Sequence, residues 1–328
     1  MEIAKTKWEE YLVRRISSNE SYHDLLTFPR YIEIETVNVC NARCPMCTIS
    51  TWERNSKPMT DELFLKISNE LIKHNDVIKR VSLYRDGEPL IDNKLASRVS
   101  ILKKGGIKEV AISTNVSLLN EKRATDLLNA GIDLVILSID SIKKDVYESI
   151  RVGLKFENVF SNAIRFIELR NKIRPETRIW VRMIRQESNN DEWDDYYSFW
   201  KNKVTNNDRV YFHYIFNWGG QLKNFKPISI SYEPNLPCVA IWSLFVIFSN
   251  GDVPLCNIDF NNKHPVGNVR DHSIEDIWKS KVITEKRYLH LNNRKGEIDI
   301  CKNCNVWDEP KDGQNISSQY ADEIELGK

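Results

Sequence analysis

The sequence predicts an α/β protein built on a parallel sheet, followed by a smaller cysteine-rich α+β segment. Two observations support this fold class. Six short apolar segments alternate with helical patterns between residues 30 and 220, as in parallel strands joined by right-handed crossovers. Beyond Trp218-Gly219-Gly220 the pattern changes to short strands, Gly and Pro turns, and four of the seven cysteines. The alternation alone allows either a doubly wound sheet or a barrel.

The expected strands cover residues 31–39, 77–83, 109–114, 134–139, 178–183 and 209–216. A helix begins at Thr60, with Asp61 and Glu62 in its first turn, and further helical patterns cover residues 93–104, 120–130, 156–172 and 190–202. The apolar run 239–248 is too short to span a bilayer and is predicted to be a buried strand. We therefore expect a helical lead-in over residues 1–29, a large domain over 30–220, a small domain over 221–315 and a polar tail over 316–328.

Composition indicates an ordinary globular protein. Of the 328 residues, 41% are hydrophobic and 28% charged, and the net charge is +1. This net charge is too small to attract a nucleic acid or an anionic membrane, so we expect neither as a partner. The N-terminus lacks the apolar core of a secretory signal, which predicts a cytoplasmic protein. Seven cysteines fit a closed disulfide framework poorly, so the thiols are free to bind metal.

Three of these thiols lie in one short loop, directly after the first expected strand. The loop reads Cys40-Asn-Ala-Arg-Cys44-Pro-Met-Cys47. A structural zinc site needs four protein ligands, whereas a four-iron cluster held by three cysteines leaves one iron open to another ligand. A zinc site that borrows a histidine, or three free thiols, is the alternative.

The spacing Cys-x3-Cys-x2-Cys resembles the motif of the radical S-adenosylmethionine (SAM) superfamily. The resemblance implies a partial (β/α)6 TIM-like barrel with the cysteine loop after its first strand. It also implies a 4Fe-4S cluster on Cys40, Cys44 and Cys47 whose open iron chelates SAM, and reductive cleavage of SAM to a 5′-deoxyadenosyl radical. An external one-electron reductant such as flavodoxin or ferredoxin would supply the electron.

The same resemblance implies a set of SAM-binding residues at the ends of the following strands. Two departures from the family pattern are Asp86, where the family's Gly-Gly-Glu-Pro turn has its first glycine, and Val116, where a glycine is common. Helix capping is the competing explanation for the Ser, Asn and Asp members. For Arg151, which resembles an arginine that pairs with the SAM carboxylate, the alternative is a solvated surface residue. The implied set is Met46, Gly87, Glu88, Pro89, Ser113, Thr114, Asn115, Ser138, Asp140 and Arg151.

The remaining cysteines, Cys238, Cys256, Cys301 and Cys304, can close a second site completely. Four thiolates suit either a structural zinc ion or a fully ligated four-iron cluster. The segments 238–256, 267–278 and 301–304 are similar to SPASM and twitch domains, a resemblance that implies one auxiliary 4Fe-4S cluster.

An auxiliary cluster without an open iron favours electron transfer. The resemblance therefore implies a radical SAM oxidoreductase that oxidises a secondary alcohol of a small sugar-like substrate or an aminocyclitol, with the auxiliary cluster accepting an electron. A peptide-modifying SPASM maturase, a radical SAM epimerase and a zinc-stabilised binding protein are the alternatives. Candidate substrate contacts at strand ends are Tyr84, Arg85, Asn217 and Trp218, and Arg182 and Met183 are possible further lining residues.

Overall fold

The computed structural model describes residues 2–55, 57–215, 217–222 and 236–304, with side chains from residue 7 onward. The polar tail 316–328 and parts of the expected small domain therefore lie outside the described residues, as does Phe216 at the end of the sixth expected strand. The expected division into four segments stays a prediction.

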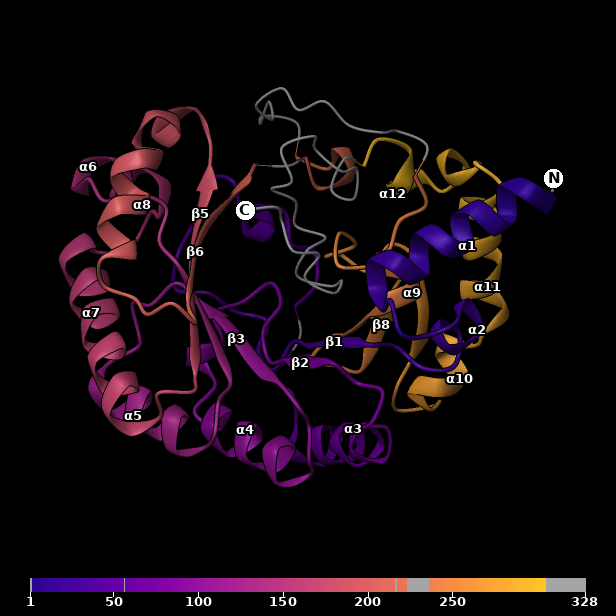
Figure 1. Ribbon diagram of the computed structural model, residues 1–328, viewed down its shortest axis with the longest axis horizontal. Coiled ribbons are helices and arrows are strands. Elements are labelled where there is room, and N and C mark those ends of the chain that lie inside the picture. Colours follow the sequence, from indigo (N-terminus) through magenta and orange to yellow (C-terminus); the bar gives the residue numbers. More distant parts are fainter. Residues whose placement is uncertain (1, 56, 216, 223–235, 305–328) are drawn as a thin grey trace.

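A single parallel sheet of seven strands organises the molecule, in the order β6-β5-β4-β3-β2-β1-β7. The α/β fold class is confirmed, and Figure 1 shows the sheet curled into a partial barrel with helices on its outer side. The strands are β1 (Tyr31–Ile34), β2 (Arg80–Ser82), β3 (Val110–Thr114), β4 (Leu134–Ser138), β5 (Arg178–Arg185), β6 (Arg209–Tyr214) and β7 (Leu244–Ile247). The outer helices are α3 (Asp61–Lys73), α4 (Leu95–Lys104), α5 (Glu121–Asn129), α6 (Lys144–Ile150), α7 (Phe156–Ile173) and α8 (Trp193–Lys201).

Local sequence explains where these helices begin. Thr60 accepts a hydrogen bond from the Leu63 backbone amide at 3.2 Å at the start of α3, and Asn120 accepts one from the Arg123 amide at 3.0 Å at the start of α5. Each cap satisfies an amide that has no partner inside its helix. The caps fix the helices that cover the outside of the sheet.

The first strand ends at Ile34, earlier than the sequence suggests. The chain leaves the sheet because its carbonyl groups take other partners: Thr36 accepts from the Met59 amide and Val39 from the Glu88 amide, both at 2.9 Å. Residues 35–39 thus run beside the turn that follows β2, and they deliver Cys40 to the open end of the barrel.

The expected strand 239–248 is wrong in its first half: residues 240–243 form the short helix α9 (Ala240–Ser243), in which the Val239 carbonyl accepts from the Trp242 amide at 3.1 Å. Only residues 244–247 form a strand, the buried β7, whose position in the sheet was not predicted. It pairs with β1 in parallel register, from Tyr31 opposite Leu244 to Ile34 opposite Ile247. The chain after β7 forms the hairpin β8 (Asp252–Pro254) and β9 (Pro265–Asn268), and then α10 (Ile274–Trp278), α11 (Lys281–Leu291) and α12 (Asp299–Lys302). The C-terminal cysteine segment is thereby continuous with the barrel sheet.

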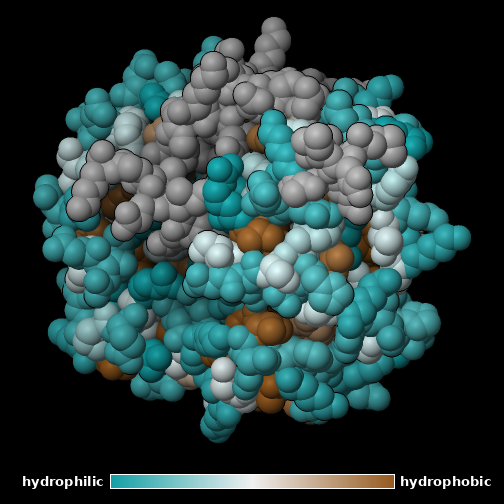
Figure 2. Space-filling view, turned by 45° about the vertical axis from the view of Figure 1, so that its right-hand side comes forward, coloured by the Kyte–Doolittle hydropathy of each residue, from teal (hydrophilic) through white to brown (hydrophobic). Residues whose placement is uncertain are grey.

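The N-terminal lead-in packs on this C-terminal part (Figure 1). Helices α1 (Glu2–Ile16) and α2 (Tyr22–Leu25) share an apolar core with α9 (Ala240–Ser243) and β7. The Tyr22 hydroxyl accepts a hydrogen bond from the Trp242 indole at 3.0 Å. The face in Figure 2 is mostly hydrophilic, with hydrophobic side chains in small separate patches. Within the described part of the chain, none of the helices has the length and apolar character needed to cross a bilayer.

Candidate active site

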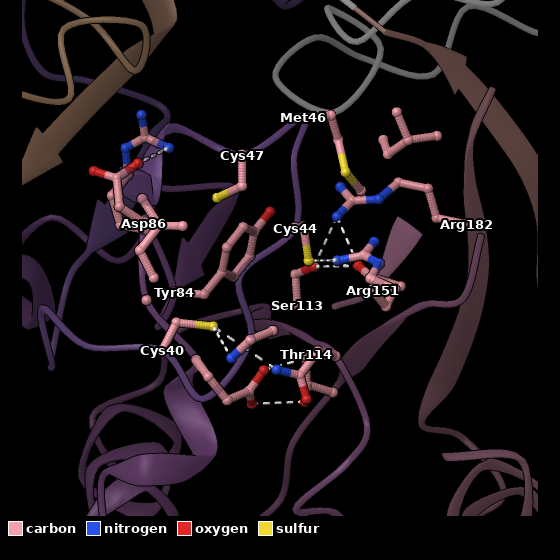
Figure 3. A pocket seen from close by; sticks show the side chains of 18 of the residues that line it. Cys40, Cys44, Met46, Cys47, Tyr84, Asp86, Ser113, Thr114, Arg151 and Arg182 are labelled. Carbon is pink, nitrogen blue, oxygen red and sulfur yellow. Dashed lines mark hydrogen bonds and ion pairs between the residues drawn. The ribbon is translucent and has the colours of Figure 1, made fainter. Parts of the chain in front are cut away.

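A cavity of about 210 Å³ opens at the carboxyl ends of the barrel strands. This is the end of a parallel α/β fold where binding groups gather, because loops from successive strands meet there. Figure 3 shows the three thiols of the cysteine loop around the same space, near the ring of Tyr84. The cavity is lined by Glu33, Cys40, Ala42, Cys44, Met46, Cys47, Ile49, Tyr84, Arg85, Asp86, Gly87, Glu88, Ser113, Thr114, Asn115, Ser138, Arg151, Arg182, Ile184, Ile215, Trp218, Asn257 and Ile258.

The cysteine loop is held by its own backbone and by its neighbours. The Arg43 guanidinium donates to the Cys40 carbonyl at 2.9 Å, and the Arg43 amide donates to the Val152 carbonyl at 2.8 Å. Donors also approach two sulfur atoms: the Asn115 amide nitrogen lies 3.9 Å from Cys40 Sγ, and an Arg151 nitrogen lies 3.8 Å from Cys44 Sγ. Such donors favour the thiolate form that binds metal.

Burial opposes the charged form of two of these thiols, Cys40 and Cys47. Burial raises the pKa of Cys40 and raises the pKa of Cys47 to about 12, and a negative charge on Cys44 works in the same direction for both. Because metal ligation requires thiolates, binding a metal cluster here releases protons. Among the described residues, no group of three or more His, Cys, Asp and Glu side chains is arranged to hold one metal ion. The three thiols that surround this space fit a four-iron cluster with one open iron.

The turn after β2 brings the chain against the cysteine loop. A Cβ atom at Gly87 would lie 2.5 Å from the Val39 carbonyl oxygen and 2.7 Å from that of Val37. Glycine is therefore required at this position. The group that lies so close to it is the backbone before Cys40, and not a ligand as the resemblance implied. The Glu88 carboxylate accepts hydrogen bonds from the Thr114 hydroxyl and the Asn115 amide, both at 2.7 Å, which ties this turn to the end of β3.

The ends of β3, β4 and β5 place three polar side chains together in the cavity. One Arg182 nitrogen donates to Ser138 Oγ at 2.8 Å and to Ser113 Oγ at 3.1 Å, and the two hydroxyl oxygens lie 3.3 Å apart. Because side chains alternate along a strand, the next residue, Met183, points into the helix-side core and does not line the cavity.

Two of the implied SAM-binding residues lie behind the cavity wall. Pro89 is buried at the start of the short helical turn η2 (Pro89–Ile91). The Asp140 carboxylate accepts from Arg151 Nε at 2.6 Å and from the Ile184 amide at 2.7 Å. Burial of Arg151 opposes its positive charge, but the nearby Asp140 carboxylate outweighs this and, with other neighbours, raises the pKa of Arg151. Asp140 therefore orients Arg151, which itself lines the cavity.

A cluster of buried charges reaches the cavity through Glu33, Arg85 and Asp86 and continues behind the lining to other charged residues, most of which were not predicted. Arg54 makes a two-pronged ion pair with Glu35, at 2.9 and 2.8 Å, and lies 3.2 Å from Asp86. Arg85 lies 3.5 Å from both Glu33 and Asp86. A glutamate between two isoleucines in a buried strand is the signal that could have identified Glu33.

Three of the four candidate substrate contacts line the cavity, and one does not. Tyr84, Arg85 and Trp218 line the cavity, and burial raises the pKa of Tyr84 to about 12. Asn217 does not line it, because its side chain accepts from the Gly219 amide at 3.1 Å and donates to the Asn303 carbonyl at 2.9 Å. Asn257 and Ile258 line the cavity without having been predicted.

The four C-terminal cysteines line a second cavity together with His290 and Lys295. The His290 ring accepts a hydrogen bond from the Cys238 amide at 3.2 Å, and burial lowers the pKa of His290 to about 3. Burial and the neighbouring thiols raise the pKa of Cys238 and Cys301, and burial raises that of Cys256 to about 12. Four close thiols that repel one another's charges fit a metal cluster, which neutralises that repulsion.

Comparison with known proteins agrees with this geometry. Residues 34–192 match the model of the radical SAM superfamily, and residues 238–305 match an iron-sulfur cluster-binding domain termed SPASM. The chain is 26% identical over 275 residues to the S-adenosyl-L-methionine-dependent 2-deoxy-scyllo-inosamine dehydrogenase of Niallia circulans, an alignment covering 84% of this chain and 92% of that protein. It is 34% identical to a Pyrococcus furiosus cofactor-modifying protein for a tungsten-containing oxidoreductase, over only 34% of this chain and 31% of that one.

Solved structures show the same fold. BtrN in complex with AdoMet and 2-DOIA superimposes with a TM-score of 0.59 at 25% identity, covering 84% of this chain and 93% of BtrN. SuiB of Streptococcus suis bound to its precursor peptide has a TM-score of 0.64 at 17% identity, covering 81% of this chain and 68% of that one.

The chain therefore belongs to the radical SAM superfamily. It is a radical SAM enzyme with a C-terminal SPASM-type domain, and its cofactors are 4Fe-4S clusters and SAM.

Proposed function

We propose that this enzyme oxidises a secondary alcohol of an aminocyclitol, sugar or related small polyol to a ketone. One observation carries the proposal: the large cavity and the four-cysteine cavity share a wall, since Ile258 lines both. An oxidation needs an electron acceptor beside the substrate, and a cluster held by the second cysteine group in the adjoining cavity would supply one. Alignment over 92% of a dehydrogenase of an aminocyclitol supports the same reaction class.

The roles of the site residues follow from their positions. Cys40, Cys44 and Cys47 would hold the SAM-binding cluster, and Cys238, Cys256, Cys301 and Cys304 the auxiliary cluster. When bound, the clusters and SAM supply a radical that removes one hydrogen atom from the substrate, and an acceptor for one electron. The remaining hydroxyl proton leaves to a base, so that the alcohol loses two protons and two electrons in all.

The chain's other cavity residues bind and orient. Arg151, fixed by Asp140, would pair with the carboxylate of SAM, and the turn Gly87-Glu88 lies beside the cysteine loop. Met46, Ser113, Thr114, Asn115 and Ser138 line the same cavity and would contact the rest of SAM. Glu33, Tyr84 and Arg85 offer hydrogen bonds to hydroxyl or amino groups of a polyol, while Ile184 and Ile215 exclude water.

The test uses anaerobically reconstituted protein, SAM, a low-potential reductant and 2-deoxy-scyllo-inosamine deuterated at each carbinol carbon in turn. We expect one labelled position to transfer deuterium to 5′-deoxyadenosine, with a ketone formed in equal amount. A Cys40→Ala variant, lacking one ligand of the SAM-binding cluster, should give neither product. Recovery of an unoxidised stereoisomer would indicate an epimerase. Turnover of peptides, with no turnover of the aminocyclitol, would indicate a maturase. Colourless protein that contains zinc instead of iron would indicate a zinc-stabilised binding protein.

We further propose that a flavodoxin or ferredoxin is the physiological electron donor and that the enzyme works in the cytoplasm. Reduction of the SAM-binding cluster requires a low-potential one-electron carrier, and free thiols persist in a reducing compartment. Substitution of purified flavodoxin for the chemical reductant in the same assay tests the first part.

A further inference from the structure

The segment Cys256–Asn257–Ile258 separates the two cavities. Cys256 lines the four-cysteine cavity, Asn257 lines the large cavity, and Ile258 lines both. Asn257 is therefore the direct chain neighbour of a thiol of the second site while it faces the space in which a substrate would lie. No other segment of the described chain contributes consecutive residues to both walls in this way.

Hydrogen bonds fix the path of this segment. The Cys256 carbonyl accepts from the Asp259 amide at 3.3 Å, and the Ile258 carbonyl accepts from the Phe260 amide at 2.9 Å. The Ile258 carbonyl also accepts from the Gln221 side chain at 3.0 Å, and Gln221 in turn donates to the Trp218 carbonyl at 2.7 Å. The backbone of Asn257 is thus held between two anchored residues.

The side chain of Asn257 stands out in this otherwise bonded segment. It is only 6% exposed, and within the described part of the chain its amide oxygen has no hydrogen-bond partner. Buried polar atoms in proteins almost always have partners, because an unpaired one loses its bonds to water without replacement. A buried amide that lines a cavity and lacks a partner is placed to bond a molecule bound in that cavity.

We propose that Asn257 is a substrate-binding residue, whose amide bonds a hydroxyl or amino group of a cyclic polyol and holds the ring against the wall of the four-cysteine site. The proposal rests on the proposed function for the class of ligand. An amide offers both a donor and an acceptor, which matches the adjacent hydroxyl and amino groups of an aminocyclitol. Asn257 would then set both which ring is accepted and how near the ring lies to the second cysteine group.

The experiment measures binding without turnover. Reconstituted enzyme loaded with S-adenosylhomocysteine is titrated calorimetrically with 2-deoxy-scyllo-inosamine and with scyllo-inositol. The Asn257→Leu variant, of similar size but without hydrogen-bonding atoms, should bind the preferred polyol about 10-fold to 100-fold more weakly, as expected when a buried hydrogen bond is lost. Asn93→Leu, at an exposed position, is the matched control and should bind like the wild type.

Two further measurements separate binding from folding. Iron content should be unchanged in Asn257→Leu, and both iron content and substrate-independent SAM cleavage should be unchanged in the control Asn93→Leu. The electron paramagnetic resonance signal of the reduced auxiliary cluster should shift on polyol addition in the wild type and not in the variant. If the leucine variant loses auxiliary iron, the same comparison is made with Asn257→Ala.

The outcomes distinguish this inference from the proposed function. Equal polyol affinity of wild type and a folded Asn257 variant would overturn the inference while leaving alcohol oxidation intact. Weakened binding in the variant, with no polyol oxidised by the wild type, would support the inference and overturn the proposed oxidation. A wild-type enzyme that binds neither polyol overturns the role given to Asn257.

Discussion

The packing of Gly87 against the strand exit before Cys40 gives a prediction about the first cysteine site. A Cβ atom in Gly87→Ala would lie 2.5 Å from the Val39 carbonyl oxygen, whereas ordinary contact begins at 3.4 Å. The Val39 carbonyl must therefore move by about 0.9 Å, and this movement would weaken or break the 2.9 Å hydrogen bond that it accepts from the Glu88 amide. Overpacking and a lost hydrogen bond together should reduce the free energy of unfolding by about 2–4 kcal/mol.

The displacement should damage the cysteine site more than the stability. Cys40 follows Val39 directly, and metal–ligand distances tolerate errors of only about 0.2 Å. We expect iron in the first site to fall and SAM cleavage to drop about 100-fold, the effect of a misplacement near 1 Å. Iron content, substrate-independent 5′-deoxyadenosine formation and the melting temperature measure these effects.

Gly296→Ala is the control, because a Cβ atom there meets nothing within 4 Å. This variant should match the wild type in all three assays. Retention of auxiliary iron in Gly87→Ala would show that the damage is local. Wild-type iron, SAM cleavage and melting temperature in Gly87→Ala would refute the reasoning.

Three further predictions follow from buried pairs and from the second site. Asp140→Asn removes the partner of buried Arg151, so SAM affinity measured by equilibrium dialysis should fall at least about tenfold, since breaking a buried pair costs about 3–5 kcal/mol; unchanged affinity would show that Arg151 needs no orienting group. Burial alone would raise the pKa of Asp208, but bonds from Arg170 and neighbouring amides lower it; its stabilisation is therefore present at neutral pH and lost as pH falls through the lowered value. Asp208→Asn should accordingly lower the melting temperature at pH 7, with a difference that shrinks below about pH 4, and a constant difference would contradict this. Cys304→Ala should lose the auxiliary iron but keep substrate-independent SAM cleavage, and iron analysis that shows an unchanged content would exclude Cys304 as a ligand.

Local patterns in the sequence were sufficient to predict the order of the first six strands and five of the six outer helices of the barrel, but the short helix α6 was missed. Alternation of apolar runs with amphipathic helices reports on neighbours within a few residues, and each of β1 to β6 lies within or close to its expected segment. The position of β7 was missed because an apolar run says that a strand is buried and does not say which strand it pairs with. That choice depends on packing between residues more than 200 positions apart, such as Tyr31 and Leu244.

The candidate site shows the same limit. The cysteines and the strand-end residues Ser113 and Ser138 come together because carboxyl ends of parallel strands meet at one edge. Asp140 follows a strand end as well, yet its carboxylate turns to Arg151 and the Ile184 amide, an orientation that no local pattern predicts. Asn257 carries no sequence signal, since its place depends on how the C-terminal segment folds back over the barrel.

Pairing of β7 with β1 has a practical consequence for dissecting the molecule. A fragment that stops before residue 236 would leave β1 as a bare sheet edge, with unpaired amides and carbonyls that favour aggregation. It would also expose the apolar flank of the N-terminal helices. Point substitutions, rather than truncations, are therefore the suitable tools for separating the contributions of the two cysteine groups.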